Sequence, residues 1–353
     1  MSFQEEKRER IKCYMLERIR LDDVEFIQKT IYNFQVSVTT VKRYIQECLE
    51  KSILLMDAKT ECGYRLQKQE YCFEYSVKDG LDEDDIYYDD ISPLLVEVTD
   101  ESKRIWRYAF MEMMNNALEH SGCKNIYCRV VKDALYTEIT ITDDGIGIFK
   151  NVQNYLTEQF GKKATYQDVL MELYKGKLTT AEQNHSGEGI FFSSKALDEF
   201  AIWSDNAVYV QGVSEQTKFV QDHLIAYYTR LKHIGTAVMM KLENRTKRVL
   251  KEVFNMYSTM DDGFVKTRIP IKDVCREGEP IARSQARKLL YRLEQFKIVE
   301  LDFSGVDFMG QGFADEVFRV FKKRYSEIQI IALNACPDIL RMIKHVQRAQ
   351  ESL

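Results

Sequence analysis

Apolar residues recur every three or four positions in three stretches of the first 55 residues, IKCYMLERIRL, VEFIQKTIYNF and VTTVKRYIQECLEKSILL. This spacing predicts three amphipathic helices, because residues three or four apart share one face of a helix. The stretch LLMDAKTECGYRLQKQEYCFEYS then predicts two extended runs joined at a turn that contains Gly63. We therefore expect residues 1–75 to fold as a unit of three helices and a hairpin.

A second pattern begins near residue 94. The stretch ESKRIWRYAFMEMMNNALEHS predicts a long helix, and the runs NIYCRVV, YTEITITD and GTAVMMKLE predict strands. After a bridging helix expected at KRVLKEVF, strand-like and helix-like stretches alternate, which indicates a sheet with parallel pairs and covering helices. The expected fold class is therefore α/β multidomain, with a second unit over residues 94–243 and a third over residues 244–353.

Composition and charge indicate folded units joined by an acidic connector. The 353 residues are 45% apolar and 30% charged, which suits two or three globular domains. Residues 1–70 carry 13 basic and 12 acidic side chains, whereas residues 71–100 carry one lysine and ten acids. We interpret residues 76–93 as a solvated connector between the first two units.

The pattern also excludes several classes of protein. No stretch contains the 18 or more consecutive apolar residues of a membrane span, and the start MSFQEEKRER is charged where a signal peptide needs an apolar segment. The eight cysteines are scattered without a Cys-x-x-Cys spacing, so we expect reduced thiols and no structural zinc site. These features predict a cytoplasmic protein without membrane contact.

Three polar residues of the long helix suggest chemistry. Glu112, Asn116 and His120 lie at positions i, i+4 and i+8, so their side chains share one face. An asparagine oxygen suits Mg²⁺, which takes few protein oxygens and completes its shell with water and phosphate. A glutamate one turn away is positioned to orient or deprotonate a water molecule. Alone, the same spacing is also that of a solvated helix face.

A glycine-rich turn follows two strands later. ITDDGIGI places Asp143 after a strand, where its carboxylate is able to accept a hydrogen bond from an amino group such as adenine N6. Gly145 and Gly147 allow the backbone to approach a ring closely and to reverse direction. This turn therefore has the residues that a base-binding pocket needs.

A second glycine-rich turn, HSGEGIFFSSKALDEF, places Gly187 and Gly189 just before a helix, whose first N–H groups suit a phosphate anion. GTAV then places Thr236 at the head of a strand. The ordered series Glu-x-x-x-Asn-Ala-x-x-His, Asp-x-Gly-x-Gly, Gly-x-Gly and Gly-Thr resembles the GHKL ATPases, which have the Bergerat nucleotide fold. The resemblance covers roughly residues 94–243.

The resemblance implies ATP and Mg²⁺ as cofactors. It makes Asn116 the Mg²⁺ ligand and Asp143 the residue that recognises adenine, with residues 149–186 as a lid over the nucleotide. The remaining expected nucleotide contacts are His120, Gly145, Gly147, Gly187, Gly189 and Thr236. Four lysines of the lid are either solvated or within reach of a γ-phosphate: Lys162, Lys163, Lys175 and Lys177.

The residues leave the catalytic outcome open. A histidine kinase needs a phosphoacceptor histidine on a helix before the ATPase segment, and none of the five histidines lies there. MEMMNNALEHSG is similar to the anti-sigma-factor serine kinases, in which the equivalent glutamate is proposed to act as base toward a protein hydroxyl. Glu112 is therefore the expected catalytic residue, either of Mg-dependent ATP hydrolysis or of phosphate transfer to a separate protein.

In the third unit, LDFSGVDFMGQGFADEVFRVF resembles the core of STAS domains, the fold of the proteins that those kinases phosphorylate. The likeness covers about residues 260–350. The family carries its phosphorylated serine in an Asp-Ser-Ser-Gly turn, where this chain has GQGF at 310–313. Ser304 lies on the preceding strand and is interpreted as a strand-end hydrogen bonder. We therefore expect a STAS-like docking or dimerisation module without the switch.

Three helices followed by a hairpin is the element order of a winged helix, and the first 70 residues resemble bacterial winged helix-turn-helix families. In such a fold the third helix presents its exposed side to a major groove. The candidate DNA contacts on that helix are Thr39, Thr40, Lys42, Arg43 and Tyr44. The alternative is a protein-docking or dimerisation module, because the charge of this segment is nearly balanced.

The order of the three units resembles bacterial or archaeal chains described as transcriptional regulators. It favours an ATP-dependent switch, acting as a homodimer, in which nucleotide binding closes the lid and changes the binding of DNA or of a partner. The alternatives are a serine/threonine kinase of anti-sigma-factor type that acts on a separate partner, and a structural ATP-binding scaffold.

Overall fold

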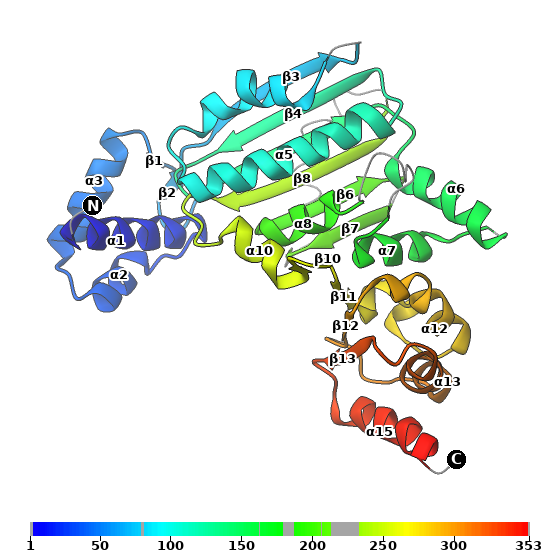
Figure 1. Ribbon diagram of the computed structural model, residues 1–353. Helices are drawn as coiled ribbons and strands as arrows, with labels where there is room; N and C mark the ends of the chain where they lie inside the picture. Colours follow the sequence, from blue (N-terminus) through cyan, green and yellow to red (C-terminus); the bar gives the residue numbers. More distant parts are fainter. Residues whose placement is uncertain are drawn as a thin grey trace.

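The computed structural model describes residues 3–78, 81–161, 163–178, 187–205, 207–212 and 233–351. They form an N-terminal unit, a central unit with a six-stranded sheet, and a C-terminal unit with a three-stranded sheet (Figure 1). The prediction of an α/β multidomain protein is confirmed. No helix in these ranges is both long enough and apolar enough to pass through a bilayer.

The N-terminal unit contains three helices and a short hairpin in the predicted order. Their bounds are α1 (Phe3–Arg20), α2 (Phe26–Phe34), α3 (Val38–Glu50), β1 (Leu54–Met56) and β2 (Tyr64–Leu66). Ser37 caps α3, because its side chain accepts a hydrogen bond from the Thr40 N–H at 3.2 Å. Gly63 lies in the loop between β1 and β2 with φ +78°. The helices enclose a small core of their own, which meets the central unit at Leu135.

β3 (Gln69–Ser76), expected as part of the N-terminal hairpin, belongs instead to the central sheet. It pairs antiparallel with β4 (Asn125–Lys132) along its whole length. Tyr71, Phe73 and Tyr75 of β3 pack against the central core, whereas the alternate side chains are exposed. The period of two was sufficient to predict a strand, but the choice of sheet depends on β4, whose paired residues lie 49 to 63 positions further along the chain. β3 therefore joins the end of the first unit to the sheet of the second.

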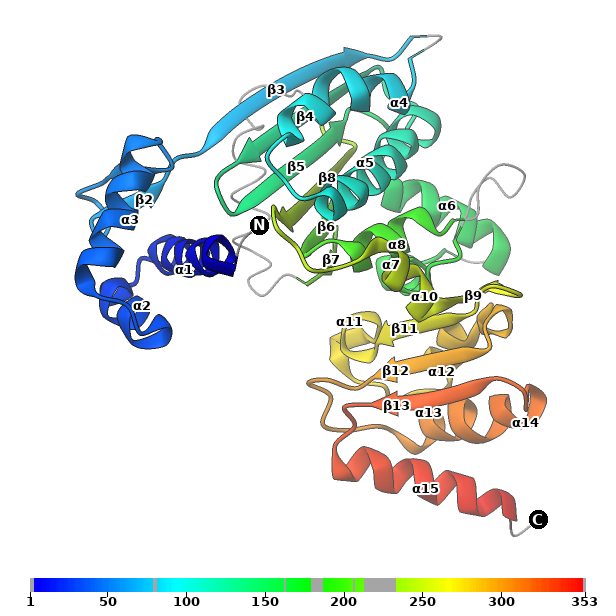
Figure 2. The same ribbon diagram turned by 60° about the vertical axis from the view of Figure 1, so that its left-hand side comes forward.

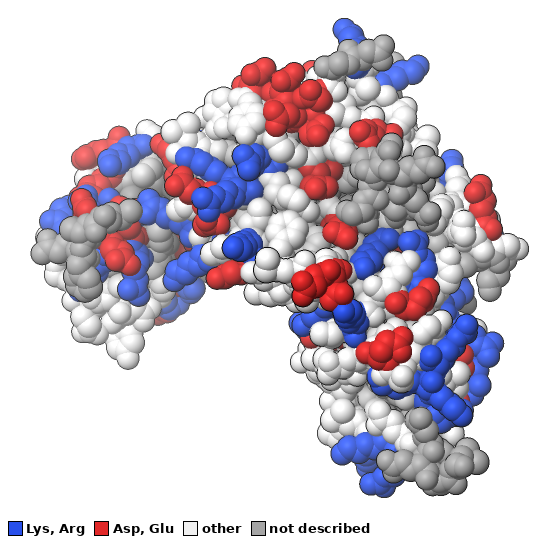
Figure 3. All heavy atoms as spheres, in the orientation of Figure 1, with Lys and Arg blue, Asp and Glu red and all other residues white. Residues whose placement is uncertain are grey.

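The acidic segment after β3 is folded onto the central unit. Three short helices lie along α5 (Asp100–His120): α4 (Glu83–Ile86), η1 (Tyr87–Ile91) and η2 (Ser92–Leu95). Ile86, Tyr87 and Ile91 are buried, so the prediction of a solvated connector is wrong at these positions. The apolar residues of the run share one helical face, and its carboxylates gather on the outside (Figure 3).

The central sheet is antiparallel throughout, in the order β3-β4-β5-β8-β6-β7. Its remaining strands are β5 (Tyr136–Asp143), β6 (Glu199–Ser204), β7 (Ala207–Gln211) and β8 (Thr236–Glu243). α5 and α8 (Gly189–Ala196) cover one face of the sheet, as Figure 1 shows. The register sets Asp143, the last residue of β5, directly beside Thr236, the first residue of β8.

The C-terminal unit alternates strands and helices as predicted. β11 (Lys266–Pro270), β12 (Ile298–Asp302) and β13 (Gln329–Leu333) pair in parallel, which confirms the expected parallel pairs. Its helices and turns are α11 (Ile271–Val274), η3 (Arg276–Gly278), α12 (Arg283–Leu290), η4 (Leu293–Gln295), α13 (Gln311–Asp315), η5 (Glu316–Phe321), α14 (Lys322–Arg324) and α15 (Pro337–Glu351). A two-residue ladder precedes them, formed by β9 (Ser258–Thr259) and β10 (Gly263–Phe264).

The central and C-terminal units share one continuous apolar core. α6 (Ile148–Phe160) leads into α7 (Tyr166–Lys175), which packs against both α8 and β11. The bridging helix appears as α10 (Leu250–Tyr257), whose Phe254 contacts Phe192 of α8. Figure 2 shows the C-terminal unit attached at this side, away from the N-terminal unit. The junction is therefore a packed interface in which α7 takes a central place.

Candidate functional site

A cavity lies between α5, the start of α8 and the turn after β5. Its apolar lining includes Ile141 and Val238 of the sheet, Leu173 of α7 and Leu178. Its polar lining consists of Asn116, His120, Ser121, Asp143, Asn151 and Thr236. Five predicted nucleotide contacts, which lie far apart in the sequence, therefore meet around this one space: Asn116, His120, Asp143, Gly187 and Thr236.

Asp143 is the buried acid of this cavity. Only 4% of it is exposed, and burial raises the pKa of its carboxyl to about 6, although hydrogen bonds from Gly145 and Thr236 oppose the shift. The Gly145 N–H donates to Asp143 Oδ1 at 2.8 Å, and the Gly235 N–H donates to the Asp143 backbone oxygen at 2.8 Å. The turn and the start of β8 thus hold this carboxyl group in the cavity wall.

The turn that follows Asp143 packs too closely for side chains. A Cβ on Gly145 would overlap the Ser121 backbone oxygen at the end of α5. Gly147 has φ +87°, which side chains disfavour, and a Cβ there would lie 2.7 Å from Ser204 Oγ. Just after the turn, the Ile148 N–H donates to the Thr236 hydroxyl at 3.0 Å. The two glycines therefore allow this turn to join the end of α5 to the sheet.

α5 supplies Asn116 and His120 to the cavity, and it places Glu112 at the first residue of α8. The helix begins at a Thr99 cap, which accepts a hydrogen bond from the Ser102 N–H, and residues four apart then share a face. The Glu112 carboxylate lies against Gly189, where any Cβ would overlap it. Glu112 thus borders the glycine-rich start of α8 rather than the end of the cavity at Asp143.

The oxygen-rich lining fits a hard cation only in part. The Asn116 amide is suited to Mg²⁺, as the sequence analysis expected. The described residues include no group of three or more His, Cys, Asp or Glu placed to hold a metal ion by themselves. A magnesium ion beside Asn116 would therefore take most of its ligands from water and phosphate.

Lys175, a predicted lid lysine, is buried in the junction and is not available to a γ-phosphate. It is 2% exposed at the end of α7. Its Nζ donates to Glu172 Oε1 at 2.5 Å and to the Tyr291 backbone oxygen at 2.7 Å. The reason is that α7 packs on the C-terminal unit, a contact between segments that lie more than 100 residues apart. The cation is thus used to join the two units.

The other lysines of the expected lid differ from one another. Lys177 donates to the Gln295 backbone oxygen at 3.0 Å and lies over the Phe296 ring at 4.8 Å, so it also contacts the C-terminal unit. Lys163 is exposed. Lys162 and residues 179–186 lie outside the described part of the chain.

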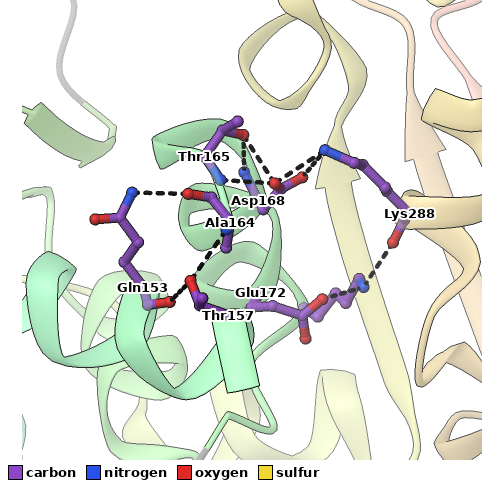
Figure 4. A network of polar contacts seen from close by, with 8 residues as sticks. Gln153, Thr157, Ala164, Thr165, Asp168, Glu172 and Lys288 are labelled. Atoms are coloured by element: carbon purple, nitrogen blue, oxygen red, sulfur yellow. Dashed lines mark hydrogen bonds and ion pairs between the residues drawn. The ribbon is translucent and has the colours of Figure 1, made fainter. Parts of the chain in front are cut away.

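Polar contacts tie both ends of α7 to α12 and the turn that follows it (Figure 4). At the start of α7, Thr165 and Asp168 form a capping box, and Lys288 of α12 donates to Asp168 Oδ2 at 2.9 Å. At the end of α7, Lys175 bonds the carbonyls of Lys288 and Tyr291. Since Leu173 of α7 lines the cavity, the C-terminal unit holds part of the cavity wall.

Some of the candidate DNA-contacting side chains are exposed, and others are buried or partly buried. Thr39, Lys42 and Arg43 are exposed on α3, and Thr40 is partly buried beside its Ser37 cap. Tyr44 is 6% exposed, so its predicted place on the open side of the helix is wrong. It lies three residues after the core residue Val41, on the same helical face.

The cations around α3 are partly balanced within the unit. Arg8 and Lys12 of α1 lie over the Tyr44 ring at 5.7 and 5.5 Å and both pair with Glu47. Hydrogen bonds from Lys12 and then Arg8 outweigh partial burial and hold the pKa of the Glu47 carboxyl at about 2. These cations are therefore engaged by Glu47 and are less available to an external anion than Lys42.

Ser304 is a strand-end hydrogen bonder, as predicted. Its hydroxyl donates to Asp302 Oδ1 at 2.7 Å. Partial burial alone would raise the pKa of Asp302, but hydrogen bonds from Asn334, Arg268 and Ser304 outweigh it and hold that pKa at about 2. The residue at the family's acceptor turn, Gly310, packs directly against the Ile281 backbone. This end of β12 is thus occupied by structural hydrogen bonds.

Two residues at or near the cavity were not predicted from the sequence. Asn151 of α6 lines it and donates to the His120 backbone oxygen at 3.5 Å. His233 Nε2 lies 3.1 Å from the Gly145 backbone oxygen. The sequence shows Asn151 as a polar residue on an amphipathic helix and His233 as a histidine just before GTAV. Neither belongs to a recognisable motif, so neither could be told apart from an ordinary surface residue.

Comparison with known protein families identifies one part of the chain. Residues 285–340 match a STAS-like domain of unknown function (DUF4325), which covers the stretch from α12 into α15. A search of the curated proteins gives no match. The C-terminal unit is therefore STAS-like, in agreement with the resemblance of its sequence.

Proposed function

We propose that the chain is an ATP-binding regulatory switch of the GHKL type, with its nucleotide in the cavity between α5 and α8. The observation that carries the proposal is that Asn116, Asp143 and Thr236 all line one cavity. These residues come from three motifs that follow one another along the chain in the order of the GHKL ATPases. In this proposal, Asp143 accepts the adenine amino group, Asn116 holds Mg²⁺, and the start of α8 receives the phosphates. The magnesium ion would neutralise phosphate charge, and Glu112 would orient the nucleophile.

The proposed switch acts through α7. The cavity measures about 100 Å³, whereas small-molecule sites usually measure about 300–1,000 Å³. Leu173 and Leu178 line it, so a nucleotide would displace the segment that carries them. The same helix is held by Lys288 and Tyr291 of the STAS-like unit. Nucleotide binding would therefore compete with docking of the STAS-like unit on α7.

A binding experiment tests the nucleotide site. Asp143→Asn keeps the shape of the side chain but replaces the charged acceptor by an amide. We expect about tenfold to hundredfold weaker Mg-ATP binding by calorimetry, from the loss of about 1.5–3 kcal/mol for a hydrogen bond to a charged group. Asp144→Asn is the matched control, because Asp144 bonds the Lys124 and Asn125 N–H groups and does not line the cavity. Equal affinities in the two variants would refute the assignment.

A second experiment separates hydrolysis, protein phosphorylation and a purely structural role. The STAS-like unit lacks a hydroxyl at the acceptor turn, so a kinase of this kind would act on a separate protein. With γ-³²P-ATP, a switch ATPase releases free phosphate, a kinase labels an added STAS-type protein, and a scaffold does neither. In either enzyme, Glu112→Gln should keep Mg-ATP binding and lower turnover about 10²–10⁴-fold. Unchanged turnover would remove Glu112 from the catalytic role.

We also propose that the N-terminal unit is a winged helix that contacts DNA through α3. The support is the order of three helices and a hairpin, together with the exposure of Thr39, Lys42 and Arg43. Phosphate contacts from such side chains position a recognition helix. The STAS-like unit is the proposed contact for a protein partner or for a second copy of the chain.

A further inference from the structure

A second cavity lies between the central and C-terminal units. It measures about 380 Å³ and has a mostly polar lining. Lys195 at the end of α8 and Gln211 at the end of β7 form one wall, and Arg268 of β11 and Asp302 of β12 belong to the other. It shares no lining residue with the cavity at Asp143. Both units are therefore needed to complete this space.

The cavity lies at the carboxyl ends of parallel strands. Pro270, the last residue of β11, pairs with Asp302, the last residue of β12, and both line the cavity. Open α/β sheets bind ligands in the crevice outside the carboxyl ends of their strands, at the point where the strand order reverses. The order β11-β12-β13 has no such reversal, but the cavity lies at the same end of the strands.

Several N–H donors in the lining of this cavity make no hydrogen bond to the described part of the protein. Arg268 directs its Nε and Nη2 to Asp302 Oδ2, and Asp302 Oδ1 accepts from Ser304 and Asn334, so this carboxylate is fully engaged. Arg268 has five N–H donors in all, which leaves its Nη1 group for a ligand. The acceptors on this wall are satisfied, while donors remain.

Lys195 forms no ion pair within 4.0 Å among the described residues, although the charges of Asp302 and Glu300 reach it from farther away. Its Nζ donates to the neutral Gln211 Oε1 at 2.8 Å, which uses one of its three N–H groups. Burial, and after it the positive charge of Arg268, lower the pKa of Lys195 to about 8, against the opposing charges of Asp302 and Glu300. A bound anion would relieve both effects, because it would supply opposite charge to two neighbouring cations.

Two other polar groups of the cavity, Asp273 and Tyr174, are hydrogen-bonded to each other and to the wall. Burial raises the pKa of the Asp273 carboxyl, and this carboxyl accepts a hydrogen bond from the Tyr174 hydroxyl at 3.3 Å. Tyr174 also bonds the Val210 backbone oxygen at 3.0 Å. Both groups are therefore engaged within the cavity wall, and the donors that remain open to a ligand belong to Lys195 and Arg268.

We propose that this cavity binds a small phosphate-bearing ligand, whose phosphate group bridges Lys195 of the central unit and Arg268 of the STAS-like unit. A tetrahedral phosphate presents oxygens in several directions, so one group is able to accept from cations on two walls, and arginine suits phosphate oxygens well. The cavity volume leaves room for a small organic group beyond the phosphate. The ligand would strengthen the contact between the two units, since each supplies one cation.

Calorimetric titration of the full chain tests the proposal, with inorganic phosphate as one probe and glycerol phosphate as the other. Lys195→Met should weaken saturable binding at least tenfold. Lys297→Met is the matched control, because Lys297 pairs with Asp262 and does not line the cavity, and it should bind as the unchanged chain does. Tighter binding of glycerol phosphate than of inorganic phosphate would identify a phosphate ester as the preferred source, and the reverse order would identify the free ion.

A second variant distinguishes loss of the phosphate site from loss of folding. Gln211→Glu places a carboxylate beside Lys195 with almost no change in volume, so it should neutralise the cation and weaken phosphate binding similarly. Thermal unfolding with and without phosphate is measured for each variant, and the stabilising shift should disappear in Lys195→Met and Gln211→Glu alone. Absence of saturable binding in the unchanged chain, or equal binding in the Lys195→Met and Lys297→Met variants, overturns the proposal. Neither result depends on ATP binding at Asp143.

Discussion

Burial of a single carboxyl group makes the proposed nucleotide site sensitive to pH. The pKa of Asp143 is raised to about 6 by desolvation, so the group is charged above that pH and protonated below it. A charged acceptor binds an amino group more strongly than a neutral one. ATP affinity should therefore be full at pH 7–8 and fall below about pH 6, by up to about tenfold per pH unit.

Titrations with a fluorescent ATP analogue between pH 5 and pH 8 measure this dependence. The nucleotide has titrating phosphates of its own, so a control within the protein is needed. Asp143→Asn provides it, because this variant has no carboxyl at the position and should lose the step near pH 6. A step of the same size in the variant would assign the pH dependence to another group.

At the scale of elements, α3 shows how one helix combines core and surface roles. Val41, Tyr44 and Ile45 face the core, while Lys42 and Arg43 face outward. If α3 contacts DNA phosphates, joint replacement of Lys42 and Arg43 by alanine should weaken binding to all sequences alike. It should also reduce the slope of log affinity against log salt by about two, since each lost contact spares about one counterion.

Anisotropy titrations at several salt concentrations, with and without ATP, measure this effect. Tyr44→Phe is the matched control, because Tyr44 is buried and its hydroxyl was a predicted contact that the fold does not place on the surface. DNA affinity should be unchanged in it. If the intact chain has no DNA affinity at low salt in any nucleotide state, the N-terminal unit is a protein-docking module.

At the scale of the whole molecule, the contact between α7 and α12 couples the cavity to the STAS-like unit. Lys288→Met leaves Asp168, which is buried, without its cation and should loosen this contact. In the proposed switch a nucleotide displaces α7, so we expect ATP affinity to rise about threefold to tenfold, the range of a coupling near 1 kcal/mol. ATP should weaken docking of the two units by the same factor.

Calorimetry with Mg-ATP measures the affinity, and limited proteolysis with and without ATP measures exposure of the junction. Lys297→Met serves as control, because its ion pair with Asp262 lies away from α7. An unchanged or lower ATP affinity in Lys288→Met would show that docking and nucleotide binding are independent.

Local patterns in the sequence were sufficient for most elements and for five residues of the cavity lining. The three N-terminal helices, the long helix α5 and the parallel pairs of the C-terminal sheet follow from spacing alone. Asn116 and His120 share a helix face by geometry, and Asp143 was identified from the strand and glycines around it. Their meeting around one space with Thr236 was predicted because four motifs occur in a recognisable order.

Tertiary structure alone decided the features that depend on distant partners. β3 has a strand pattern, but its sheet is set by β4, and the acidic run is folded because α5 offers it an apolar surface. A lysine in this stretch of the sequence is expected to be solvated. In the structure, the Lys175 ammonium group instead donates a hydrogen bond to the Tyr291 backbone oxygen in the junction. Periodicity describes which face of an element is apolar, whereas the partner that covers this face comes from elsewhere in the chain. The cavity at Lys195 and Arg268 has the same origin, because it exists only where two units meet.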